Sequence, residues 1–208
     1  MNADRMTQRV QEALNSAYTR ALAEHNPQTT PEHLLAALLD QDEGVAPAIL
    51  EKANVDVAAL RRAVDAAIGR LPRLSGSNAD NAQVTVAPAI PRVFTQAESE
   101  AKQLGDEYTS VEHLLLALVD ANTDAAKVLR DAGVTRDKLL VALRTIRGNQ
   151  RVTTQNPEGT YQTLERYGRD LTKAAAQGNA AAKSLLDAAK DTFTDDERQQ
   201  GETMAAQN

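Results

Sequence analysis

An internal duplication constrains the fold of this chain more than any other feature of its sequence. The segment Thr29–Asp40 reads TTPEHLLAALLD, and the segment Thr109–Asp120, 80 residues later, reads TSVEHLLLALVD. A second matched pair follows, ILEKANVDVAAL at Ile49–Leu60 and VLRDAGVTRDKL at Val128–Leu139. The repeated unit spans about 65 residues, which is too long for the repeat of a solenoid. The chain therefore contains two copies of one folding unit.

The apolar residues within each unit have helical spacing. Val10, Leu14, Ala17 and Ala21 recur every three or four residues, as on one face of an α-helix. The EHLL segments likewise carry stripes that are two residues wide. Each unit should therefore hold four helices, and we expect these at roughly 4–25, 31–40, 45–53 and 56–69, then 89–104, 110–120, 124–132 and 135–147.

Helix start signals precede both EHLL segments. Thr29 with Glu32, and Thr109 with Glu112, have the spacing of a capping box, in which each side chain bonds a backbone amide of the other residue. Pro31 falls in the first helical turn, where the missing N–H of proline costs nothing. Both segments should therefore begin helices at these residues.

Further signals separate the helices that follow. Asn54 and Gly133 occupy matching positions where a left-handed residue would end a helix, and Asp56 and Thr135 then cap the next helix. The stretch 71–88 is rich in Pro, Gly, Ser and Asn and reads as a loop, with a short extended piece at Val84–Val86.

We therefore predict an all-α fold with two tandem four-helix repeats in a pseudo-twofold arrangement, followed by a helical linker and tail. Residues 1–148 form the double-repeat domain, with repeat one at 1–70, the loop at 71–88 and repeat two at 89–148. Residues 149–208 form the linker and an Ala-rich helical tail.

Composition excludes several classes of function. The chain has no Cys and three His, so that a typical zinc site lacks ligands, and we expect no metal, no cofactor and no enzymatic activity. The net charge of −6 comes without a basic patch, which argues against nucleic-acid binding. No apolar run approaches the roughly 20 residues needed to span a bilayer, and the polar start lacks a signal peptide. These features predict a cytoplasmic protein without membrane contact.

The duplicated EHLLxAL helices, the four-helix unit and the Arg-Leu-Pro loop at 70–72 resemble the double Clp repeat at the amino terminus of ClpB-type protein disaggregases. Residues 147–178, which include an RDLT motif, resemble the linker of the same family. After Gly178 the family pattern stops, and GNAAAKS at 178–184 lacks the second Gly of a phosphate loop. The ATPase modules of the family are therefore not expected in this chain.

The resemblance implies a shallow groove that binds extended, unfolded polypeptide. On the family's pattern its polar groups would be Thr7, Asp106 and Glu112, and Val93 and Leu114 could line its floor. Each residue also has a simpler interpretation. Thr7 could be exposed in a first helical turn, Asp106 a turn residue, Glu112 a capping residue, and Val93 and Leu114 ordinary core.

His33 and His113 stand at equivalent repeat positions beside apolar stripes, which favours partly buried core residues over metal ligands or catalytic groups. Tyr161, Leu164, Tyr167 and Leu171 form an amphipathic stripe, which would pack on the repeat domain or on a partner.

The predicted function is a substrate-recognition module of a Clp chaperone, whose partners are unfolded or aggregated proteins. Two alternatives stay open: a stand-alone docking or adaptor subunit of a Clp (AAA+) ring, or a truncated product of a full disaggregase gene.

Overall fold

The computed structural model describes residues 3–41, 44–75, 83–148 and 150–157, which form one compact helical unit. A short 3₁₀ helix at Ala3–Arg5 precedes α1. The helices of repeat one are α1 (Gln8–Ala23), α2 (Pro31–Asp40), α3 (Val45–Lys52) and α4 (Val57–Ile68). Those of repeat two are α5 (Ala89–Leu104), α6 (Val111–Asp120), α7 (Asp124–Asp131) and α8 (Arg136–Arg147). The expected all-α fold is confirmed, and each predicted helix is present within a few residues of its expected bounds.

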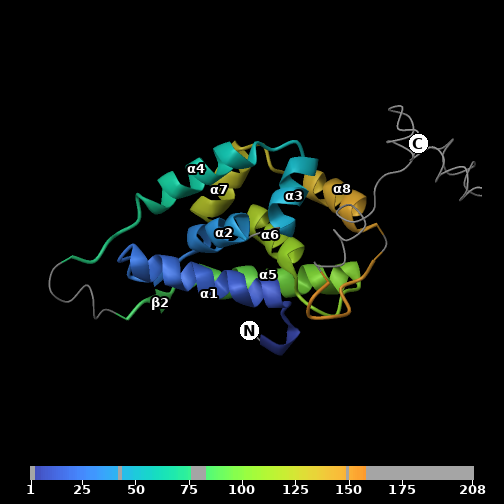
Figure 1. Ribbon diagram of the computed structural model, residues 1–208, viewed down its shortest axis with the longest axis horizontal. Coiled ribbons are helices and arrows are strands. Elements are labelled where there is room, and N and C mark those ends of the chain that lie inside the picture. Colours follow the sequence, from blue (N-terminus) through green and yellow to red (C-terminus); the bar gives the residue numbers. More distant parts are fainter. Residues whose placement is uncertain (1–2, 42–43, 76–82, 149, 158–208) are drawn as a thin grey trace, which may run out of the picture. The chain divides into compact units, whose positions relative to one another are not determined.

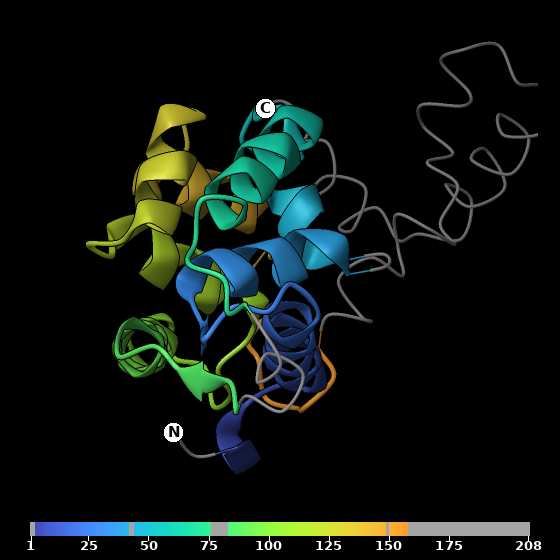
Figure 2. The ribbon, with the colours of Figure 1, turned by 90° about the vertical axis from the view of Figure 1, so that its left-hand side faces the viewer.

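The helices form three layers (Figures 1 and 2). The long helices α1 and α5 lie side by side in the lowest layer, α2 and α6 form the middle, and α3, α4, α7 and α8 cover the top. The middle helices are buried on nearly all sides: of the ten residues in each, only the last, Asp40 or Asp120, is exposed. This burial explains why the EHLL segments carry apolar residues around almost the whole helix.

Each pair of helices in contact has a counterpart, which is found by replacing each helix with the equivalent helix of the other repeat. The helix pair α1 and α2 corresponds to α5 and α6, α2 and α4 to α6 and α8, and α3 and α6 to α7 and α2. The two repeats also interlock, because α3 packs on α8 while α4 packs on α7. These exchanges are those of a pseudo-twofold axis, as the duplication predicted.

The predicted stop and start signals between the top helices are confirmed. Asn54 and Gly133 follow α3 and α7 with φ of 60° and 77°. Asp56 then accepts a hydrogen bond from the Ala59 amide at 2.9 Å, and Thr135 accepts one from the Lys138 amide at 3.3 Å.

The predicted capping boxes at Thr29 and Thr109 are wrong by one residue. The caps are Thr30 and Ser110, and their partners are His33 and His113 rather than the glutamates. The physical reason is that Thr29 and Thr109 are extended and already bonded to other chain segments, so that the helices start after the next residue.

Two short parallel pairings hold these segments. Strand β1 (Gln28–Thr29) pairs with β2 (Thr85–Val86), which lies within the extended piece expected at Val84–Val86. In repeat two, Met6 forms the matching isolated bridge with Thr109. Each pairing sits directly before one of the middle helices. The expected tail helices and the stripe from Tyr161 to Leu171 lie outside the described residues.

Candidate functional site

The structure brings the three predicted polar residues to one end of α6. The Thr7 amide donates to the Thr109 carbonyl at 3.0 Å, just ahead of α6. Asp106 lies in the turn between α5 and α6, and Glu112 in the first turn of α6. All three residues are buried, and the Asp106 side chain has no exposed surface. The simpler interpretation of Thr7 as an exposed residue is therefore wrong.

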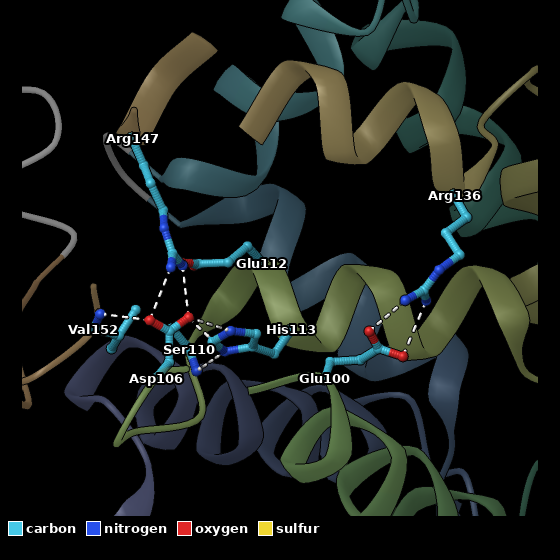
Figure 3. Close-up of polar contacts among 8 residues, drawn as sticks. All are labelled: Glu100, Asp106, Ser110, Glu112, His113, Arg136, Arg147 and Val152. Carbon is cyan, nitrogen blue, oxygen red and sulfur yellow. Dashed lines mark hydrogen bonds and ion pairs between the residues drawn. The ribbon is translucent and has the colours of Figure 1, made fainter. Parts of the chain in front are cut away.

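Asp106 is the centre of a buried ionic cluster (Figure 3). Arg147, the last residue of α8, donates to both carboxylate oxygens of Asp106 at 2.8 Å and to Oε1 of Glu112 at 3.2 Å. Asp106 Oδ1 also accepts from the Val152 amide at 2.8 Å. Because one guanidinium joins two carboxylates, the α5–α6 turn, α6 and the end of α8 are held together.

The environment keeps Asp106 ionised. Burial by itself raises the pKa of a carboxyl, but hydrogen bonds from His113, Arg147 and the Val152 amide outweigh burial and lower the pKa of Asp106 from 3.8 to about 2. Asp106 is thus a fixed negative charge over the whole physiological range, with every oxygen already accepting at least two hydrogen bonds.

His113 links the cluster to the helix cap. Its Nδ1 accepts from the Ser110 amide at 2.9 Å, which leaves the proton on Nε2 to be donated to Asp106 Oδ2 at 2.9 Å. His33 repeats the arrangement, with Nε2 3.0 Å from Oδ1 of Asn26. Both histidines are fully buried, more deeply than the partial burial predicted, and both ring nitrogens of each are engaged. Repeat two thus carries a carboxylate where repeat one has an amide.

The equivalent glutamates have different partners. Glu32 Oε1 accepts from the amide of Ala125, in the first turn of α7, at 2.9 Å. Glu112 instead faces Arg147, and its Oε2 is buried without a hydrogen-bond partner within the described residues. Glu112 is therefore not a capping residue, and its Oε2 is enclosed by the protein.

The two predicted apolar residues lie apart from this cluster. Leu114 is fully buried in the core within α6. Val93, in the amino-terminal half of α5, is buried under a hollow of about 310 Å³ between α5 and the end of α6. The hollow has an apolar lining of Ala89, Ala117 and Ala121 with a polar rim.

Two further hollows, of about 260 and 550 Å³, lie directly beside Asp106. One of about 260 Å³ is lined by Arg5, Lys102, Glu107 and Thr109 together with Asp106. It mixes acidic and basic groups over a short distance, which suits the backbone and mixed side chains of a polypeptide.

Asp106 is not suited to act as an acid or base near neutral pH. A catalytic acid or base needs a titratable group near the pH of reaction, whereas Asp106 is saturated with donors and has a pKa of about 2. Among the described residues no group of three His, Asp or Glu side chains is placed to hold a metal ion. Nor is any described helix long and apolar enough to cross a membrane.

Sequence reasoning missed two members of the site, Arg147 and Val152. Both come from the carboxyl-terminal side of the repeats, 41 and 46 residues from Asp106. No motif near Arg147 or Val152 in the sequence indicates a contact with Asp106. The only signs were that Arg147 ends a predicted helix and that Val152 is an isolated apolar residue in a polar stretch.

Comparisons with known proteins identify relatives of this chain in sequence and in fold. The Clp repeat (R) N-terminal domain family matches residues 5–132. The chaperone protein ClpB of Bacillus cereus (strain ATCC 14579) is 41% identical over 178 residues, which cover 86% of this chain. ClpB of Corynebacterium diphtheriae is 41% identical over 172 residues, or 83% of this chain. The chain spans about a fifth of the length of these curated relatives.

Solved structures share the fold. The Hsp104 N-terminal domain from Candida albicans superposes with a TM-score of 0.64 at 22% identity, covering 74% of this chain and 98% of that one. The N-domain of ClpV from Vibrio cholerae gives 0.55 at 17% identity, covering 68% and 84%. With eight α-helices in two interlocked repeats among the described residues and this extent of sequence identity, the chain belongs to the Clp repeat N-terminal domain family, with ClpB-type chaperones among its relatives.

Proposed function

We propose that this chain is a client-recognition module, which binds unfolded or aggregated polypeptide weakly and without covalent chemistry. The observation that carries the proposal is the convergence of Thr7, Asp106 and Glu112 at one end of α6, from segments about a hundred residues apart in sequence. The relationship to ClpB chaperones over 178 residues supports the same reading.

The geometry suggests how such a surface would work. Arg147 balances one of the two negative charges of Asp106 and Glu112, so that the cluster keeps a single buried net negative charge and does not select for highly charged clients. The hollow beside Asp106 offers polar groups for peptide backbone, and the hollow over Val93 offers apolar surface. Both properties suit segments that lack a defined sequence.

The two repeats do not offer the same surface. In repeat one, Gln41 stands where repeat two has Ala121, and its amide donates to the Arg9 carbonyl at 2.7 Å. The smaller Ala121 lines the hollow between α5 and α6, whereas Gln41 lines a hollow of about 450 Å³ between α1 and α2. We propose that Val93, together with Leu114 beneath the surface, shapes an apolar contact in repeat two.

The test is binding of the chain to a labelled, permanently unfolded polypeptide, followed by fluorescence anisotropy. We expect a dissociation constant of roughly millimolar to micromolar. Thr7→Ala and Glu112→Ala should weaken binding while the helical circular dichroism is retained. Glu51→Ala, the same change at an exposed position of α3, is the matched control.

Binding that is indifferent to both substitutions would remove Thr7 and Glu112 from the site. Absence of binding, with recovery of a single Clp subunit at fixed stoichiometry, would instead indicate a docking role on a Clp ring.

A further inference from the structure

Residues 150–157, which follow α8 and are termed here the exit segment, cross the α5–α6 turn like an added extended chain. The Val152 amide donates to Asp106 Oδ1 at 2.8 Å. The Val152 carbonyl accepts from the amides of Glu107 at 2.9 Å and Tyr108 at 3.3 Å. One residue of the segment thus satisfies a carboxylate and two backbone donors of the turn.

A second contact lies at the start of α1. The Gln155 carbonyl accepts from the Gln8 amide at 2.8 Å, and its side chain reaches the Asp4 carbonyl at 3.3 Å. Val152 and Pro157 are buried, whereas the other residues of the segment are exposed. The segment is therefore held mainly through backbone atoms and one aliphatic side chain, which is how extended peptides bind with little sequence selectivity.

The carboxylate and the backbone amides that bond to Val152 are held in place by contacts that do not involve the exit segment. Arg147 and His113 hold the Asp106 carboxylate from α8 and α6. The Asp106 amide bonds the Ala101 carbonyl at 2.8 Å, and Gly105, with φ of 74°, sets the turn that presents the next two amides. The site is preorganised for whatever extended chain occupies it.

In repeat one, residues 72–74 cross the turn between α1 and α2 in the equivalent way, but the groups that hold them differ. There the Leu74 amide donates to the His25 carbonyl at 2.8 Å, and the Asn26 side chain donates to the Pro72 carbonyl at 2.8 Å. In this crossing the backbone N–H and carbonyl groups pair with neutral partners, and Arg73 adds an ion pair with Glu24 at 3.1 Å. In repeat two, the Asp106 carboxylate accepts the hydrogen bond from the Val152 amide. This bond is charge-assisted and therefore stronger than a bond between neutral groups.

Open space lies beside the exit segment and beside the turn that it crosses. A hollow of about 500 Å³ is lined by Gln150 and Arg151 together with Leu104, Leu140 and Leu143. The hollow beside Asp106 and Glu107 lies next to the same turn. An incoming chain could therefore meet the turn beside the segment and replace its bonds one at a time.

We propose that the exit segment occupies an acceptor site for extended polypeptide, and that a client binds by displacing it, pairing its own backbone with Asp106, Glu107 and Tyr108 and placing an aliphatic side chain in the position of Val152. This inference rests on the proposed function. Each hydrogen bond that the segment loses is remade by the client, so that displacement exchanges equivalent contacts.

The decisive experiment locks the segment in place. Gln8 and Gln155 are exposed, and a backbone hydrogen bond of 2.8 Å holds the two residues next to each other, so that this pair is chosen for a disulfide. Since the chain has no cysteine, the double variant Gln8→Cys, Gln155→Cys forms a single defined crosslink, and its reduced form is the matched control.

We expect the oxidised variant to bind the labelled unfolded polypeptide at least roughly tenfold more weakly than the reduced form, because the competent state is no longer populated. Val152→Ser should loosen the segment and strengthen binding severalfold, whereas Val141→Ser, the same change at an exposed position of α8, should not.

Equal binding by the oxidised and reduced forms would overturn the inference and leave the proposed function standing. Unchanged or weaker binding by Val152→Ser with an intact helical spectrum would also overturn it. Absence of binding in every form would refute the proposed function, and the inference with it.

Discussion

Replacing Asp106 by asparagine tests whether the ionic cluster holds the fold together. The substitution keeps the shape of the side chain but removes the charge that Arg147 and His113 both contact. The pKa of Asp106 is lowered from 3.8 to about 2, and this difference corresponds to about 2.5 kcal/mol of stability, since one pH unit is worth about 1.4 kcal/mol.

The sign of the pH dependence follows from the direction of the shift. Because the carboxyl of the folded chain is the stronger acid, the unfolded chain takes up the proton first as the pH falls. The stabilisation is therefore complete above about pH 4 and is lost as the pH falls towards 2.

We expect Asp106→Asn to lower the free energy of unfolding by about 2 to 4 kcal/mol at pH 7, since Arg147 also loses its main buried partner. Urea denaturation followed by circular dichroism between pH 7 and 2 measures the effect. The gap between wild type and variant should shrink by about 2 kcal/mol between pH 7 and pH 2. Asp131→Asn, which removes an exposed charge from α7, is the control.

Two results would refute this reasoning. One is a variant as stable as the wild type at pH 7, within about 0.5 kcal/mol, which would mean that the cluster contributes nothing net. The other is a constant gap between pH 4 and 2, which would show that Asp106 has an ordinary pKa in the folded chain.

Three further substitutions probe other parts of the fold. Glu32→Ala removes the acceptor of the Ala125 amide at the start of α7 and should cost about 1–2 kcal/mol in urea denaturation, with partial recovery in Glu32→Gln. Burial lowers the pKa of His33, so that the wild type should lose stability as the pH falls below 6.5, and His33→Gln should flatten that loss in the same assay. Gly105→Ala forces a side chain into a left-handed conformation and should lower thermal stability by about 1 kcal/mol. Its new Cβ would lie 3.5 Å from Arg151, an ordinary contact, so that a much larger loss would contradict this assignment to backbone strain.

The helices of this protein could be predicted because their signals are local. Apolar spacing located α1 to α8, and Asn54 and Gly133 marked two helix ends. The capping boxes were placed one residue early because Thr29 and Thr30 both suit a cap. Pro31 could have decided between them, since proline favours the first helical position and so makes Thr30 the cap.

The candidate site could be predicted only in part because its contacts are tertiary. Nothing near Asp106 in the sequence indicates that a guanidinium 41 residues away neutralises it. Strand β1 is two residues long, and its pairing with β2 depends on the return of the chain after the loop. The packing of Val152 is equally invisible, because one apolar residue in a polar stretch has no periodicity.

The interlocking of the top helices has a consequence for synthesis on the ribosome. When repeat one has emerged, α3 and α4 still lack α8 and α7, which are encoded about 80 residues later. At about 5–20 residues per second, their apolar faces stay uncovered for about 4–16 s. The first half of this chaperone-family domain therefore passes through a stage in which it exposes the kind of surface that chaperones recognise.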